Sequence, residues 1–90
     1  MRNSEFYIIP FRSSVAALKV EKELKDMFVT RVINTPHELA AGCGASLRID
    51  TTDENQLIRF LIESGQSGTL YKMKSRVLDG DHPIEEIVKF

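Results

Sequence analysis

The sequence predicts an α+β fold in which one antiparallel sheet is packed against two amphipathic helices. Three observations lead to this fold class. Four segments are rich in aromatic and β-branched residues, two segments carry apolar residues at spacings of three and four, and the order is strand, helix, strand, strand, helix, strand. A chain of 90 residues with 42% hydrophobic and 28% charged residues has the composition of a single globular domain and not of a disordered segment.

The first strand and the first helix are marked by a change of hydrophobic period. Residues 5–11, "EFYIIPF", predict a strand, and Pro10 suits its end better than its centre. Ser13 or Ser14 offers a hydroxyl N-cap to a helix spanning Val15–Met27. The inner stripe of that helix is expected to consist of Ala17, Val20, Leu24 and Met27.

Two strands follow the first helix. Residues 28–34, "FVTRVIN", form a strand by composition, although Val32 and Ile33 point to opposite faces, and Pro36 ends it. In the next strand one face is predicted to be buried, because apolar and polar residues alternate. The apolar set is Ala45, Leu47 and Ile49, and the polar set is Ser46, Arg48 and Asp50.

The second helix and the fourth strand complete the pattern. Thr52 or Asp53 caps the helix, and Gly65 stops it. Its inner face is expected to consist of Leu57, Ile58, Leu61 and Ile62. Residues 68–74, "GTLYKMK", then predict the fourth strand.

The order βαββαβ is that of the split βαβ unit, or ferredoxin-like plait. It assigns residues 1–74 to one domain and residues 75–90 to a C-terminal extension. In the extension, Asp79-Gly80 predicts a turn, and Pro83 can open a short terminal helix at its first position.

Composition and charge exclude several classes of function. A net charge of −1 gives no basic face for nucleic acid, and no apolar run approaches the roughly 20 residues of a membrane helix. One cysteine forms no intramolecular disulfide and no metal site by itself, so we expect no metal, no cofactor and a reducing, cytoplasmic setting. Convergent carboxylates, a phosphate-binding glycine loop and a catalytic triad are not recognisable in the sequence.

The candidate site is the cysteine in "GCG", Cys43, between Gly42 and Gly44. In a plait with strand order 4-1-3-2, four features are expected at one edge: the end of the first strand, the start of the first helix, the loop before the third strand and the end of the second helix. Cys43 would then lie near Arg12 and the first helix N-terminus, whose partial positive charge favours the thiolate. The alternative is that Cys43 is a small buried apolar residue.

Supporting roles are open for five further residues in this arrangement. His37 could act as a base or contact an anion, or it could be solvated. Arg48 could bind an anion or pair with a carboxylate on a neighbouring strand, and Ser13 is most simply the helix cap. The glycines on either side, Gly42 and Gly44, permit close approach of another molecule to the backbone.

Three segments together resemble a family of small bacterial proteins named for selenium/sulfur carriers. They are Phe11-Arg12-Ser13 before an Ala- and Glu/Lys-rich helix, the strand "RVINTPHEL", and the C-G-x-x-L-R pattern of residues 43–48. The resemblance covers roughly residues 5–74. His37 stands where this family commonly has arginine, and the Cys-Pro-x-Pro motif of better-understood sulfur carriers is absent.

The resemblance implies that Cys43 carries sulfur or selenium as a persulfide or selenide, received from a donor protein and passed to an acceptor protein. This function would be that of a carrier and not of a stand-alone enzyme. A rival interpretation is a non-catalytic ligand-binding or assembly module in which Cys43 is structural, and a redox-sensing thiol is a third.

Self-association is expected from the first strand, which has large apolar residues on both faces. The two helices cover one face, so the other needs a partner. The C-terminal tail could cover it from within the chain, but a symmetric homodimer is the prediction, and light scattering at micromolar concentration distinguishes the two.

Overall fold

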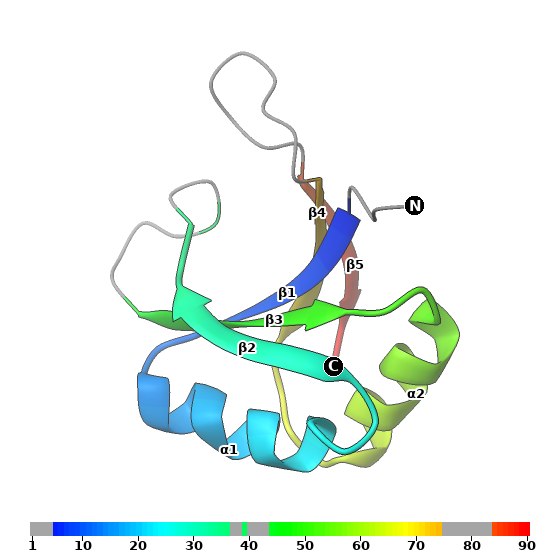
Figure 1. Cartoon of the computed structure of the whole chain (residues 1–90), viewed down its shortest axis with the longest axis horizontal. Helices are drawn as coiled ribbons and strands as arrows, with labels where there is room; N and C mark the ends of the chain where they lie inside the picture. Colours follow the sequence, from blue (N-terminus) through cyan, green and yellow to red (C-terminus); the bar gives the residue numbers. More distant parts are fainter. Residues whose placement is uncertain (1–4, 37–38, 40–43, 75–83) are drawn as a thin grey trace.

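The computed structural model describes residues 5–36, 39, 44–74 and 84–90. Seven elements follow one another along the chain. They are β1 (Glu5–Phe11), α1 (Ser14–Leu24), β2 (Val29–Asn34), β3 (Ala45–Asp50), α2 (Glu54–Glu63), β4 (Thr69–Lys74) and β5 (Ile84–Lys89). The five strands form one antiparallel sheet in the order β2-β3-β1-β4-β5. Figure 1 shows how strongly this sheet twists: β4 and β5 run across the direction of β2 and β3.

The main core lies between the two helices and one face of the sheet. Both helices contribute to it, and so do the alternate residues of the central strands. Its fully or nearly fully buried members are Tyr7, Ile9, Val20, Leu24, Phe28, Leu47, Ile49, Leu57, Leu61 and Leu70. The predicted buried face of β3 is therefore confirmed for Ala45, Leu47 and Ile49, although Ser46 on its other face is buried as well. Strand β1 has apolar residues on both faces, as predicted, and this core contains Tyr7 and Ile9.

Both helices begin where the sequence indicated. The Ser13 hydroxyl accepts a hydrogen bond from the Ala16 N–H, and the Asp53 carboxylate accepts one from the Gln56 N–H. Helix α2 ends before Gly65, which adopts a φ of 80° as helix-stopping glycines commonly do.

The inner faces of the helices are narrower than the sequence indicated. Helix α1 ends at Leu24, so Met27 is half exposed and Phe28 packs in the core in its place. The predicted inner residue Ile62 of α2 is also more than half exposed, whereas Leu57 and Leu61 are fully buried and Ile58 packs against the same core, partly buried.

A second, smaller cluster occupies the opposite face of the sheet. Phe6, Ile8 and Met73 are buried there, and four partly buried residues pack against them: Ile33, Leu39, Tyr71 and Ile84. Val32 joins the main core while Ile33 joins this cluster, as their opposite orientations required. Since a single chain already buries Phe6 and Ile8, they do not need a second subunit to exclude water, and self-association stays a prediction.

The expected C-terminal helix is wrong. Residues 84–89 form β5, which pairs with the edge of β4 and adds a fifth strand to the sheet. An eight-residue helix is too short to be stable alone, whereas β5 gains a ladder of hydrogen bonds and partly buries its β-branched residues. Ile87, Val88 and Phe90 pack on the main core. The predicted Asp79-Gly80 turn lies outside the described residues.

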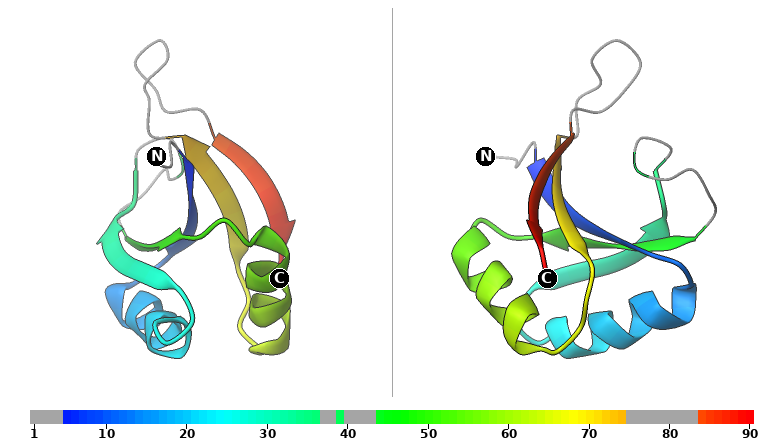
Figure 2. Two further views of the ribbon diagram at one scale, coloured as in Figure 1. Left: turned by 45° about the vertical axis from the view of Figure 1, so that its right-hand side comes forward. Right: turned by 180° about the vertical axis from the view of Figure 1, so that it is seen from behind.

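The position of α2 also departs from the expected arrangement. Its C-terminal end was expected beside the start of α1. Instead, the Gln66 side chain just beyond α2 donates a hydrogen bond to the Glu23 carboxylate, near the end of α1. Figure 2 shows, in its right-hand view, the C-terminal end of α2 near the end of α1 and away from its start. Glu23 is ten residues beyond Ser13, about 15 Å along a helix axis. Helix α2 therefore lies away from the edge where β3 begins (Figure 2).

Candidate functional site at the start of β3

The chain enters β3 directly against the end of β1. Ala45 lies opposite Phe11 in the β1–β3 ladder, and a Cβ atom placed on Gly44 would come within 2.5 Å of the Phe11 carbonyl oxygen. The Arg12 carbonyl oxygen would be 3.6 Å from the same atom. The backbone at position 44 therefore has room for glycine alone, and the segment that leads into α1 lies beside it, as the sequence predicted.

Two contacts close the base of the loop between β2 and β3. The Thr35 N–H donates to the Gly44 carbonyl across the loop at 3.4 Å. The hydroxyl oxygens of Thr35 and Ser46 are hydrogen-bonded at 2.8 Å, and Ser46 is completely buried. Sequence reasoning missed this pair, because Ser46 stands on the polar side of an alternating strand and the cover on that side was not foreseen.

The start of α1 faces the same edge of the sheet. With Ser13 as the cap, the remaining free N–H groups of the first turn carry the partial positive charge of the helix. The first turn contains no acidic residue that would reduce this charge. Arg12 is exposed immediately before the cap.

Arg48 pairs with a carboxylate, but not one on a neighbouring strand. Its guanidinium contacts Asp50, two residues along the same face of β3, with N–O distances of 3.2–3.4 Å. It also lies over the Phe6 ring, 4.0 Å from the ring centroid. Arg48 is thereby held over the second cluster and is not directed toward Gly44.

Three residues of the predicted site lie outside the described residues: Cys43, Gly42 and His37. The structure thus brings together Gly44, Arg12 and Ser13, and it separates Arg48 from them. Within the described part of the chain, His, Asp and Glu side chains form no group of three that could hold a metal ion. Neither helix in this part is long and apolar enough to cross a membrane.

Comparison with known proteins gives one match. Residues 6–70 match the model of the family described as "Putative Se/S carrier protein-like". The chain belongs to this family. The matched region runs from β1 to the start of β4 and includes Cys43 and Gly44. No curated protein and no solved structure was found to be similar to the chain.

A second polar group lies at the other end of β1, near the start of α2. The Tyr7 hydroxyl donates a 2.9 Å hydrogen bond to Glu54 Oε1. The Lys72 ammonium lies 3.7 Å from Glu54, 3.9 Å from Glu5 and 5.7 Å from the centre of the Tyr7 ring. This network joins β1, β4 and α2, and the sequence alone gave no signal for it.

Burial raises the pKa of Tyr7 well above its usual value, and the hydrogen bond to Glu54 and the negative charges of Glu54, Glu5 and Glu85 raise it further. The folded protein therefore keeps the Tyr7 proton at a pH where the unfolded chain, with a tyrosine pKa near 10, has lost it. The resulting stabilisation is complete below about pH 10 and is lost as the pH rises above it.

We expect the Tyr7→Phe variant not to lose stability in this way above about pH 10. Between pH 8 and pH 11 the wild-type free energy of unfolding should fall by about 1.4 kcal/mol more than that of the variant. Urea denaturation at each pH measures the difference, and Tyr71→Phe is the matched control that should retain the wild-type profile. Parallel profiles for wild type and Tyr7→Phe would contradict the assignment.

Proposed function

We propose that this protein is a small carrier of sulfur or selenium and that the Cys43 thiolate holds the carried atom. The observation that supports this most directly is the family match over residues 6–70, which includes the only cysteine of the chain. The close approach of Gly44 to Phe11 and Arg12 adds support. Cys43 directly precedes Gly44 in the sequence, and Gly44 lies beside the segment that leads into α1.

The chemistry is a transfer of one sulfur atom between thiols. The Cys43 thiolate attacks the terminal sulfur of a donor persulfide, a new S–S bond forms at Cys43, and the donor S–S bond breaks. The electron pair of the broken bond leaves with the donor thiolate, so no external oxidant or reductant is consumed. An acceptor thiolate then removes the terminal sulfur in the same way, and Cys43 is released as a thiolate.

Two positive influences would favour the Cys43 thiolate. The first is the N-terminal end of α1, and the second is the exposed guanidinium of Arg12. The supporting roles of Gly42 and His37 are part of the proposal, as are a cytoplasmic setting, donor and acceptor proteins, and a homodimer. We also infer that residues 5–74 are a ferredoxin-like plait with a displaced α2, because β2-β3-β1-β4 is the strand order of that fold.

The pH dependence of Cys43 alkylation tests the proposal. The rate of iodoacetamide labelling, followed by mass spectrometry, should titrate with a midpoint below the free-thiol pKa of about 8.5. Arg12→Gln should move the midpoint upward, while Arg59→Gln, on α2, should leave it in place. Incubation with glutathione persulfide should add one sulfur atom to the wild type and none to Cys43→Ser.

The alternative function, a non-catalytic module with a structural cysteine, makes the opposite prediction. Cys43 would then label slowly, with a midpoint at or above about 8.5, and would not accept sulfur from the persulfide. Either result alone would remove the physical basis for a carrier.

A further inference from the structure

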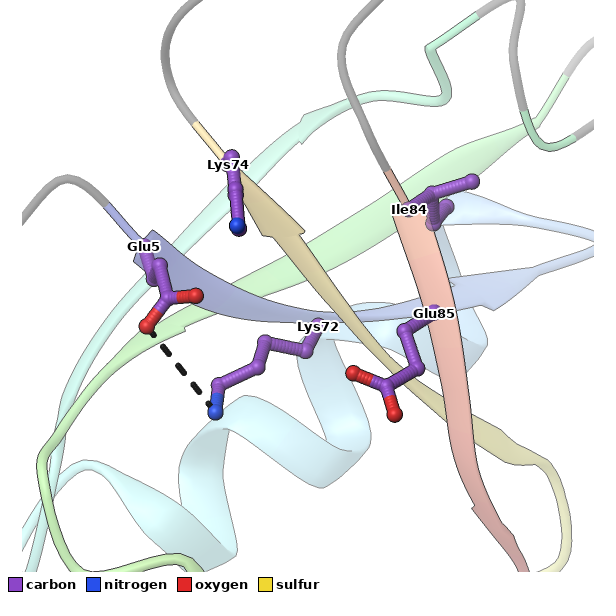
Figure 3. Close-up of a pocket in the computed structure, with 5 residues that line it drawn as sticks. All are labelled: Glu5, Lys72, Lys74, Ile84 and Glu85. Carbon is purple, nitrogen blue, oxygen red and sulfur yellow. Dashed lines mark ion pairs between the residues drawn. The ribbon is translucent and has the colours of Figure 1, made fainter.

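A cavity of about 220 Å³ lies over β1, β4 and β5, at the opposite end of β1 from Gly44. Figure 3 shows its lining: the heads of four charged side chains gather over these three strands, with Ile84 at one side. The charged residues are Glu5, Lys72, Lys74 and Glu85. Since β1 is seven residues long, this cavity is about 20 Å from Gly44, so it is a site separate from that of Cys43.

The charges of the lining alternate from strand to strand. The lysines of β4 are flanked by Glu5 on β1 and by Glu85 on β5, and the pairing register places Glu5 opposite Lys74 and Lys72 opposite Glu85. The backbones of neighbouring strands lie about 4.8 Å apart, so each lysine of β4 has a glutamate beside it on an adjoining strand. The cavity therefore presents both charges to a single small molecule.

The observed ion pairs leave hydrogen-bonding capacity at Lys72. Its ammonium lies 3.9 Å from Glu5 and 3.7 Å from Glu54, both distances longer than a charge-assisted hydrogen bond of about 2.7–2.9 Å. An incoming carboxylate can approach this ammonium more closely than either glutamate does. Lys72 is also largely shielded from solvent, with 28% of its side chain exposed, which strengthens such a contact.

Size and charge together define the class of ligand. The volume is smaller than the 300–1,000 Å³ typical of sites for drug-sized molecules. A phosphate or a dicarboxylate brings more than one negative charge to a lining that holds two glutamates, and a diamine brings two positive charges to a lining that holds two lysines. A small zwitterion meets complementary groups at both ends. Ile84 borders the cavity on β5, but its side chain packs on the second cluster, on the other face of the sheet.

We propose that this cavity binds a free α-amino acid, with the carboxylate at Lys72 and the ammonium group at Glu85. In an α-amino acid the same carbon carries both charged groups, and Lys72 and Glu85 stand opposite each other on adjacent strands. The site does not depend on Cys43 or on sulfur transfer, and it gives the protein a small-molecule binding activity in addition to the proposed carrier function.

The test compares three small ligands of similar size by NMR titration of the ¹⁵N-labelled full chain. L-serine carries both charges, lactate carries only the carboxylate, and ethanolamine carries only the ammonium group. L-serine should shift the amide signals of β4 and β5 saturably, with a dissociation constant on the order of 1 mM or tighter. Lactate and ethanolamine should bind at least about tenfold more weakly, because each loses one charged contact.

Two variants locate the site. Glu85→Gln should weaken L-serine binding about tenfold or more. Its matched control is Glu86→Gln, the same change on the next residue of β5, which lies on the opposite face and should bind normally. Lys72→Gln should also weaken binding, and the exposed Lys89→Gln should not. Absence of saturable shifts, equal binding of lactate, or normal binding by Glu85→Gln would each overturn the proposal.

Discussion

Replacing Gly44 with alanine should lower the free energy of unfolding by about 2–3 kcal/mol, a large fraction of the stability of a 90-residue domain. The added Cβ would lie 2.5 Å from the Phe11 carbonyl oxygen, far inside van der Waals contact. That oxygen belongs to the backbone of β1, so no side-chain rotation can relieve the contact. Either β3 moves away from β1, or the segment before α1 shifts, and both changes weaken the ladder at Phe11 and Ala45.

The matched control is Gly65→Ala. A Cβ at Gly65 meets nothing within 4 Å, so the only cost there is the positive φ, about 1 kcal/mol. Urea denaturation followed by circular dichroism measures both variants. Equal losses for the two glycines would show that the contact with Phe11 is relieved without cost and that position 44 does not require glycine.

Gly44 also gives a physical reason for part of the C-G-x-x-L-R pattern. The glycine allows β3 to begin directly against β1, and Leu47 fills the main core. Arg48 covers the Phe6 ring and pairs with Asp50. These three residues therefore have structural roles, which leaves the cysteine as the residue of the pattern whose role is chemical in our proposal.

Local sequence was sufficient to predict the elements whose residue pattern is compatible with only one type of secondary structure. The alternation of residues 45–50, the caps at Ser13 and Asp53 and the stop at Gly65 each express a short-range preference that the surrounding fold does not oppose. The pairing of the first and third strands followed from chain order. The proximity of Gly44 to the start of α1 could therefore be predicted before any coordinates were known.

The sequence-based predictions were wrong or incomplete where contacts between distant segments decide the local structure. Ile84, Ile87 and Val88 have helical spacing, but the free edge of β4 selects the strand for residues 84–89. Burial of Ser46 depends on Thr35 and on the second cluster, neither of which is encoded near position 46. The charged cavity depends on the registers of three strands, including β5, so it could not be predicted once β5 was taken for a helix.

The largest effect on folding is expected from removing β5. A chain ending at residue 83 loses the edge strand and exposes apolar surface that Ile87, Val88 and Phe90 cover in the main core. Full burial of one such side chain contributes about 1.5–3 kcal/mol, so the three partly buried residues together account for a loss on the order of 3–5 kcal/mol. A domain of this size has little more than that in total. We therefore expect the truncated chain to be largely unfolded at 25 °C.

A single substitution gives a graded version of this experiment. The Phe90 ring packs over Gly68, where an added Cβ would lie 3.2 Å from the ring, and two reciprocal backbone hydrogen bonds of 2.8 Å join the same residues. Phe90→Ala should lower the free energy of unfolding by about 2 kcal/mol, less than the 3–5 kcal/mol of a fully buried phenylalanine. The neighbouring exposed Lys89→Ala should change it by less than about 0.5 kcal/mol.

Circular dichroism and urea denaturation of the wild type, the truncated chain and the two point variants decide whether β5 belongs to the folding unit or is an extension beyond residue 74. A truncated chain with the wild-type denaturation midpoint would mean that β5 docks on a domain already stable without it. If the truncated chain had a lower denaturation midpoint but an unchanged m-value, the contribution of β5 to stability would lie between these limits. Because β5 supplies Ile84 and Glu85, the same truncation should also abolish the charged cavity, so any truncated chain that remains folded should fail to bind L-serine.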